Sequence, residues 1–181
     1  TPTRCNENDL AEIVYTSGTT SLPKGVIITN KNLLSNIESM EKLIDFNLGK
    51  VNLLSLLPLS HMFEQNIGFY LAINYGSKII YLFSKKSSAI IETINDENIK
   101  FIVSVPLFLS SIKEKIELLT NNRKTDKAIN FIRKYEKYPL WIRNIIFSSI
   151  RKSLGDLKYI TVGGAPLDLE VEKFWRTLGF D

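Results

Sequence analysis

The sequence predicts an α/β fold, a mostly parallel sheet with helices on both faces, from three observations. Short apolar runs alternate with segments of helical period along most of the 181 residues. The runs are nearly continuous, which is typical of strands buried on both faces of a parallel sheet. Proline or glycine closes several of them. Because ligands of such sheets bind at the carboxyl ends of the strands, we expect functional residues in the loops that follow.

The first elements predicted are a strand at residues 11–15, a polar loop and a helix at 31–44. Apolar residues at helical spacing predict the helix, and Thr29 or Asn30 is its expected N-cap. Strand, polar loop and helix in this order are the layout of a phosphate-binding site.

The middle of the chain repeats the pair of strand and helix three times. Pro58 and Pro106 stop two of the apolar runs, and Gly76 follows a predicted helix. Ser87 or Ser88 is the expected N-cap of another helix. The predicted elements are strands 51–57, 78–83 and 101–105, and helices 63–75, 87–94 and 107–119.

Residues 121–154 break this rhythm, because they predict helices only. A strand at 157–162 resumes the sheet, the tight loop 163–166 follows, and Asp168 is the expected N-cap of a final amphipathic helix. We expect residues 1–181 to form a single, partial domain with a basic helical segment at about 121–154.

That basic segment carries nine Lys/Arg against two Asp/Glu between residues 123 and 152. A solvated helical face is the favoured explanation. The alternative is peripheral contact with an anionic bilayer surface, where basic side chains add to apolar burial. Nucleic acid is disfavoured, because no known binding motif accompanies the charge. The residues that could settle into a bilayer surface are Phe131, Tyr135, Tyr138, Trp141, Ile142, Ile145 and Phe147.

Composition indicates a soluble globular protein, with 44% hydrophobic and 23% charged residues. The single cysteine, Cys5, rules out an internal disulfide and fits a reducing compartment. No basic-then-apolar leader is present, and no apolar run approaches the roughly 18 residues of a membrane span. We therefore expect a cytoplasmic location.

The loop at residues 15–25 (YTSGTTSLPKG) suits a polyphosphate. It offers several hydroxyls, a glycine that lets the backbone approach a ligand, and a lysine on a loop that we expect to be mobile. An ordinary solvated turn is the alternative. A P-loop is disfavoured, since its second glycine and magnesium-binding hydroxyl are missing. The candidate residues are Thr16, Ser17, Gly18, Thr19, Thr20, Ser21 and Lys24.

Residues 13–26 resemble the signature of adenylate-forming enzymes, which include acyl-CoA synthetases, luciferase-like ligases and adenylation domains of peptide synthetases. The family pattern ends in Thr-Gly-x-Pro-Lys-Gly-Val, and Ser21 stands where glycine is usual. The resemblance implies that the loop binds ATP, that Lys24 and Thr16 are catalytic, and that Thr16 contacts Mg²⁺.

Two further stretches support the resemblance in the expected order. Residues 57–64 (LPLSHMFE) are similar to a stretch of long-chain acyl-CoA synthetases, which implies that His61 borders the acyl entrance. Residues 163–167 (GGAPL) are similar to the loop on which adenine and the acyl group pack, which implicates Gly163, Gly164, Ala165 and Pro166. A structural histidine and a plain connecting turn are the respective alternatives.

Together these stretches resemble part of the large N-terminal domain of an ATP-dependent ligase of fatty-acid and lipid metabolism. The resemblance implies fatty acid, ATP and coenzyme A as substrates, with magnesium. The family's Tyr-Gly-x-Thr-Glu stretch, ribose-binding Asp and C-terminal Lys are not found here, so we expect a fragment that is inactive by itself. Alternatives are a ligase that loads a carrier protein and a non-catalytic domain that binds nucleotide or a partner. Phe69, Tyr70, Leu71 and Ile73 could line an acyl tunnel or belong to the core.

Overall fold

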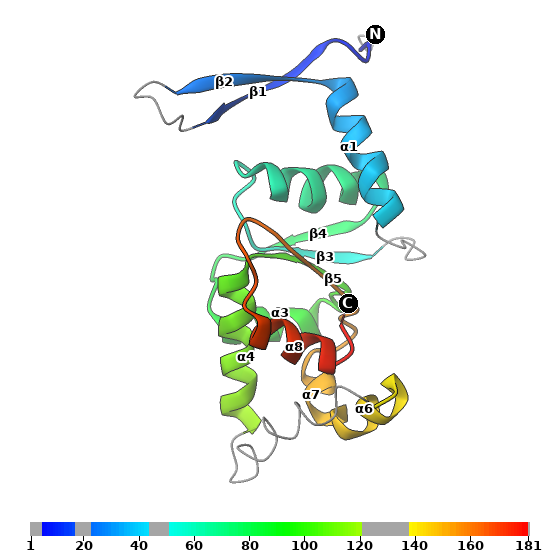
Figure 1. Ribbon diagram of the computed structural model, residues 1–181, viewed down its shortest axis with the longest axis vertical. Helices are drawn as coiled ribbons and strands as arrows, with labels where there is room; N and C mark the ends of the chain where they lie inside the picture. Colours follow the sequence, from blue (N-terminus) through cyan, green and yellow to red (C-terminus); the bar gives the residue numbers. More distant parts are fainter. Residues whose placement is uncertain (1–4, 17–22, 44–50, 121–137, 181) are drawn as a thin grey trace. The chain divides into compact units, whose positions relative to one another are not determined.

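The computed structural model describes residues 5–16, 23–43, 51–120 and 138–180, which belong to two compact units (Figure 1). The first unit is Thr1–Leu48 and the second is Gly49–Asp181. The second unit contains the parallel sheet and most of the helices.

The first unit is a β-hairpin followed by a helix. Strand β1 (Leu10–Thr16) pairs antiparallel with β2 (Lys24–Thr29), and α1 (Asn30–Leu43) follows directly. The loop expected at residues 15–25 is shorter at both ends, because β1 extends to Thr16 and β2 begins at Lys24, and its residues 17–22 lie outside the described residues. Strand β2 was not predicted. The run Val-Ile-Ile-Thr in that segment is rich in β-branched residues, which favour strands.

Helix α1 begins with a reciprocal cap. The Asn32 N–H donates to Thr29 Oγ1 at 3.3 Å, and the Thr29 N–H donates to Asn32 Oδ1 at 3.0 Å. This exchange has the pattern of a capping box, with asparagine in place of the usual Glu or Gln. It confirms Thr29, of the two predicted residues, as the N-cap.

The second unit contains a parallel sheet of four strands in the order β4-β3-β5-β6. The parallel sheet predicted from the apolar runs is confirmed. The chain passes from β3 to one side for β4 and then to the other side for β5 and β6. This reversal next to β3 makes the β3–β5 boundary the topological switch point, where open α/β sheets bind ligands. The strands are β3 (Asn52–Ser55), β4 (Lys78–Tyr81), β5 (Phe101–Ser104) and β6 (Tyr159–Val162).

Helices cover both faces of this sheet, as the sequence predicts (Figure 1). Leu54 and Ile102 point into the larger core with the helices α3, α4, α7 and α8. Their neighbours along the strands, Leu53 and Phe101, are also buried and point to the opposite face, where η1 packs on β3 and β5. The helices are η1 (Glu64–Leu71), α2 (Ala72–Asn74), α3 (Ser87–Asp96), α4 (Pro106–Thr120), α6 (Leu140–Ile146), α7 (Ser148–Ser153) and α8 (Leu169–Thr177).

Two helix starts test the predicted caps. Asp168 is confirmed, since its Oδ1 accepts from the N–H of Glu170 at 2.8 Å and of Val171 at 3.4 Å. The prediction for α3 is wrong, because its N-cap position is Lys86 and no side chain caps it. Ser87 already lies inside the helix, where its hydroxyl cannot serve as the N-cap.

The predicted helix 63–75 is present, but its first part, η1, is a π-helix. The basic segment is helical in its described part, 138–154, while 121–137 lie outside the described residues. Across the described ranges, no helix has both the length and the apolar character needed to cross a membrane.

Candidate functional site

The site begins at the carboxyl ends of β3, β5 and β6, which lie side by side at one edge of the sheet. The segment after β3 leads through residues 56–63 into η1, and the segment after β6 is the loop 163–166. The stretches 57–64 and 163–167 therefore follow β3 and β6, the two strands that flank β5 beside the switch point.

Phe63 and Gly163 bring these two stretches into contact. A Cβ atom at position 163 would lie 2.5 Å from Cε2 of the Phe63 ring, so the ring packs directly on the glycine backbone. The Gly163 N–H donates to the Ser104 carbonyl at 3.2 Å, which ties the loop to the end of β5. Gly164 has φ +84°, a conformation that favours glycine. Both glycines are thus required by the geometry.

His61 lies in the turn two residues before Phe63, and its side chain is exposed. The His61 N–H donates to the Pro58 carbonyl at 3.0 Å, and its own carbonyl accepts from the Gln65 N–H at 3.0 Å. The backbone of the turn is thereby fixed while the imidazole remains accessible to a ligand. The structure places His61 and residues 163–166 in the same unit, on loops joined by the Phe63–Gly163 contact.

Glu64 is a buried acid that is not among the site residues predicted from the sequence. Its exposed fraction is 0%, and burial raises its pKa above the ordinary value, against the opposing effects of Ser55, the Leu57 N–H and Lys85. The pKa of Tyr81 is also raised, by burial and by the Glu64 charge. The signal available in the sequence was a glutamate inside the apolar helical stretch of the LPLSHMFE motif.

Thr16 and Lys24 are brought together in the first unit, at opposite ends of the hairpin loop. They are partners in the β1–β2 register, and the Thr16 hydroxyl donates to the Lys24 carbonyl at 3.4 Å. The expectation that Lys24 sits on a mobile loop is wrong, because Lys24 is the first residue of β2. Its side chain is exposed, as is that of Thr16. The intervening predicted residues, Ser17, Gly18, Thr19, Thr20 and Ser21, lie outside the described residues.

The described hairpin residues offer some of the groups that a nucleotide with bound magnesium needs. Mg²⁺ prefers oxygen ligands and commonly completes its shell with water and substrate phosphates. Thr16 offers one accessible hydroxyl oxygen, whose hydrogen bond to the Lys24 carbonyl is long, and Lys24 offers a positive charge beside it. Within the described ranges, no group of three His, Cys, Asp or Glu side chains could hold a metal ion by itself.

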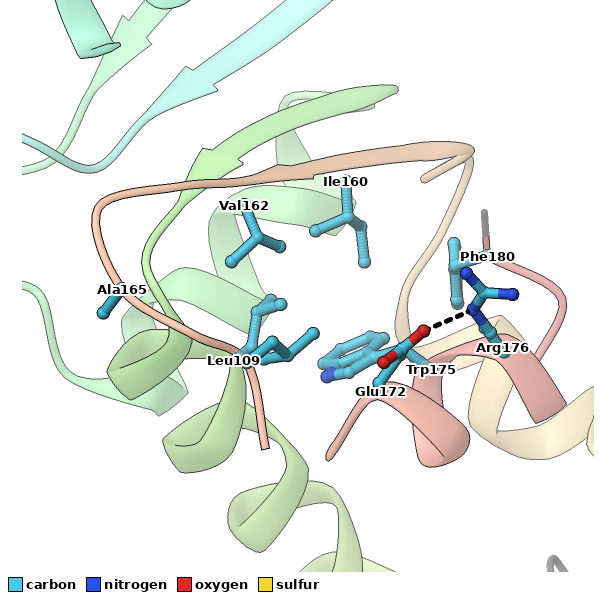
Figure 2. Close-up of a pocket in the computed structure, with 9 residues that line it drawn as sticks. Leu109, Ile160, Val162, Ala165, Glu172, Trp175, Arg176 and Phe180 are labelled. Carbon is cyan, nitrogen blue, oxygen red and sulfur yellow. Dashed lines mark ion pairs between the residues drawn. The ribbon is translucent and has the colours of Figure 1, made fainter. Parts of the chain in front are cut away.

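A pocket of about 310 Å³ lies beneath β6, between α4 and α8 (Figure 2). Figure 2 shows Leu109, Ile160 and Val162 facing the Trp175 ring across this space. The Glu172–Arg176 ion pair, 2.9 Å long, lines one side. Ala165 is the one predicted site residue in its wall, so the pocket adjoins the 163–166 loop. Its largely apolar lining suits an apolar group.

Comparison with known proteins finds relatives that match nearly the whole chain. The profile of a family described as AMP-binding enzyme matches residues 1–181. "Long-chain-fatty-acid--CoA ligase 1" of Cavia porcellus is 30% identical over 93% of this chain and 26% of its own length. The chloroplastic "Long-chain-fatty-acid--[acyl-carrier-protein] ligase AEE15" of Arabidopsis thaliana is 26% identical over 96% of this chain and 29% of its own length. The chain thus spans between a quarter and a third of these relatives.

Solved structures share the fold. The N-terminal domain of FACL13 from Mycobacterium tuberculosis superposes with a TM-score of 0.68 at 20% identity, covering 99% of this chain and 37% of that one. The O-succinylbenzoate coenzyme A synthetase of Bacillus subtilis, in complex with ATP and magnesium ion, gives 0.64 at 22% identity, covering 97% and 30%.

Proposed function

The chain belongs to the AMP-binding enzyme family, and on that premise we propose that the intact protein is an ATP-dependent long-chain acyl-CoA synthetase. Relatives that are named long-chain-fatty-acid–CoA ligases support the substrate class. The single observation that carries the proposal is the contact of Phe63 with Gly163. It joins the stretch proposed to face the acyl group to the loop proposed to face the nucleotide.

The proposed reaction has two steps. A carboxylate oxygen of the fatty acid attacks the α-phosphorus of ATP, and the bond to the β,γ-phosphates breaks, giving acyl-adenylate and pyrophosphate. The thiolate sulfur of coenzyme A then attacks the acyl carbon, and AMP leaves with its electron pair. The first step needs no general base, because a carboxylate is already a nucleophile.

In the first step, some residues of this chain would bind the substrates and others would stabilise charge. Lys24 would offset the negative charge that grows on the departing pyrophosphate. Thr16 would contribute an oxygen to bound magnesium. Magnesium supplies further positive charge at the phosphates when bound. Residues 17–21 would add hydroxyls and backbone amides.

The second unit would hold the other two parts of the substrate. Gly164 presents backbone without a side chain, so a flat adenine ring can lie against it together with Ala165 and Pro166, while the Phe63 ring covers the side-chain face of Gly163. His61, exposed on the fixed turn, would border the entrance for the carboxylate and acyl group. These roles are carried over from the family resemblance onto positions that the fold makes accessible.

Transfer to a carrier-protein thiol is the second candidate, favoured by the relative named an acyl-carrier-protein ligase. The chemistry of the first step is the same, and only the thiol acceptor differs. A domain that binds nucleotide or a partner without turnover is the non-catalytic alternative.

Exchange of labelled pyrophosphate into ATP tests the proposal on the intact protein. We expect exchange that depends on a long-chain fatty acid, followed by thioester formation when coenzyme A is added. Thioester formation only with acyl-carrier protein would select the second candidate. Absence of exchange with fatty, aromatic and amino acids alike would overturn the enzyme proposal and leave the non-catalytic one.

Location at a membrane surface is a further part of the proposal. None of the α6 residues is buried, and Trp141 and Ile145 are 65% and 68% exposed. The exposed Lys152 follows on α7. Exposed large apolar side chains followed by a basic one match the chemistry of an anionic bilayer surface. We propose a cytoplasmic protein that contacts such a surface peripherally.

A further inference from the structure

Glu64 is fully buried at the start of η1, in the segment that leaves the switch point. Glutamate is rarely buried completely without a partner, because removing its polar oxygens from water is costly. Neither carboxyl oxygen of Glu64 has a well-formed hydrogen bond among the residues that the structure describes, and the same holds for the buried Ser55 hydroxyl. Ser55 is the last residue of β3, so these unsatisfied groups stand at the two ends of one turn.

The helix is shaped to receive this carboxyl. A Cβ atom at Gly68, four residues after Glu64, would overlap the Glu64 Oε1 atom, so the carboxyl occupies the space that any other residue at 68 would fill. Gly68 is itself buried inside η1, and a stretch of π-helix is uncommon and frequent at functional sites. The glycine and the glutamate are therefore matched to each other.

The surroundings of the carboxyl are polar on the side of the sheet. Burial raises the pKa of Glu64, while the Ser55 hydroxyl, the Leu57 N–H and the positive charge of Lys85 act in the opposite direction. Tyr81 at the end of β4 is the other titratable group that interacts with it. Ser55 pairs with Tyr81 across the sheet, so both lie at the carboxyl ends of adjacent strands.

We propose that Glu64 is a positioning residue for His61 and Phe63. Its buried carboxyl fills the space beside Gly68 and interacts with the Ser55 hydroxyl at the end of β3, and so sets the path of the turn between β3 and η1. That turn carries the exposed His61 and places the Phe63 ring against Gly163. The role of His61 and Gly163 in substrate binding rests on the proposed function, whereas the effect of Glu64 on the turn does not.

Hydrogen–deuterium exchange of the turn amides in the intact protein tests the structural half without substrate. The variants are Glu64→Leu, which removes the polar group, Glu64→Gln, which keeps it, and Ser55→Ala. Ile94→Val in α3 is the matched control, because Ile94 is fully buried in the core on the opposite face of the sheet. The amides of His61 and Gln65 report on the turn, since both donate within it.

We expect Glu64→Leu and Ser55→Ala to raise exchange at these two amides by about tenfold, because each removes one side of the polar interaction between the buried carboxyl and the Ser55 hydroxyl. Glu64→Gln should stay near wild type, and so should Ile94→Val. Unchanged exchange in both Ser55→Ala and Glu64→Leu would overturn the proposal. If Glu64→Leu fails to fold, unchanged exchange in Ser55→Ala would overturn it.

Kinetics supply the second readout. In an active intact enzyme, Ser55→Ala and Glu64→Leu should lower kcat/KM for the fatty acid by about tenfold and leave the KM for ATP unchanged, with rescue in Glu64→Gln. Ile94→Val should leave both unchanged. Equal loss in the control and in Ser55→Ala would reduce Glu64 to a general stabilising role. A wild-type protein without adenylating activity would overturn the proposed function alone, because the exchange result stands independently.

Discussion

The Phe63 ring packs on the Gly163 backbone so closely that a methyl group at position 163 would lie 2.5 Å from ring atom Cε2. This contact joins the turn after β3 to the loop after β6 across the end of β5. Because β5 lies between those two strands, no local signal in either stretch predicts it.

Gly163→Ala should therefore damage both stability and activity. Overpacking of this kind typically costs about 1–3 kcal/mol, and here it displaces the turn that carries His61. We expect a lower melting temperature and a reduced rate of pyrophosphate exchange. Adding Phe63→Leu, which removes the ring, should recover part of the stability. A double variant no more stable than Gly163→Ala would contradict the steric explanation.

Glu64 should make stability depend on pH. Its folded pKa is raised above the ordinary value of 4.5, so the folded state binds more protons than the unfolded state between these two pKa values. The free energy of unfolding contributed by Glu64 consequently falls as pH rises through that window. Urea unfolding of wild type and Glu64→Gln from pH 4 to pH 8 should show the variant gaining stability relative to wild type as pH increases. Parallel curves for the two proteins would refute the raised pKa.

Lys24→Ala should slow adenylation more than it weakens ATP binding. Lys24 is exposed at the start of β2 beside Thr16, and a positive charge there is most useful on a group that becomes more negative in the transition state. Loss of one such contact costs on the order of 10²-fold in kcat. Lys31→Ala, an exposed lysine at the start of α1, is the control and should be near wild type. Equal turnover of Lys24→Ala and wild type would remove Lys24 from the mechanism.

Fold class and local caps could be predicted because they depend on residues close in sequence. The apolar runs predict the parallel sheet, and Asp168 and Thr29 cap helices through groups within three residues. The family resemblance, predicted from three short motifs, is confirmed by the match over residues 1–181.

What could not be predicted depends on partners distant in sequence or on competing local patterns. Strand β2 was missed because its pairing with β1 decides its structure, and Pro23-Lys24-Gly25 also has the composition of a loop. Glu64 and Ser55 meet only once η1 packs on β3. Leu71 and Ile73, both proposed as tunnel or core residues, differ in burial: Leu71 is buried and Ile73 is exposed. The assigned roles of the site residues stay predictions.

Trp141→Ala should weaken binding to anionic vesicles. The Trp141 side chain is exposed on α6, so its removal costs little stability but takes away apolar area that a bilayer surface could bury. Co-sedimentation of the intact protein with vesicles of phosphatidylserine and phosphatidylcholine measures the effect, and phosphatidylcholine vesicles alone are the control. Equal sedimentation of variant and wild type would leave α6 as an ordinary solvated face.

Chain length of the acid substrate gives the sharpest test of the proposed substrate class. Phe69 and Tyr70 on η1 are half-buried, so part of their surface remains available to an acyl chain on that face. Each methylene buried on binding contributes roughly 0.8 kcal/mol, which corresponds to roughly fourfold in kcat/KM per carbon until the binding site is full. We expect kcat/KM to rise from acetate through medium to long chains in a thioester assay of the intact protein. Amino acids and aromatic acids, supplied at the same concentrations, are the control substrates. A maximum at acetate, or at one of the control acids, would preserve the adenylating chemistry and refute the long-chain assignment.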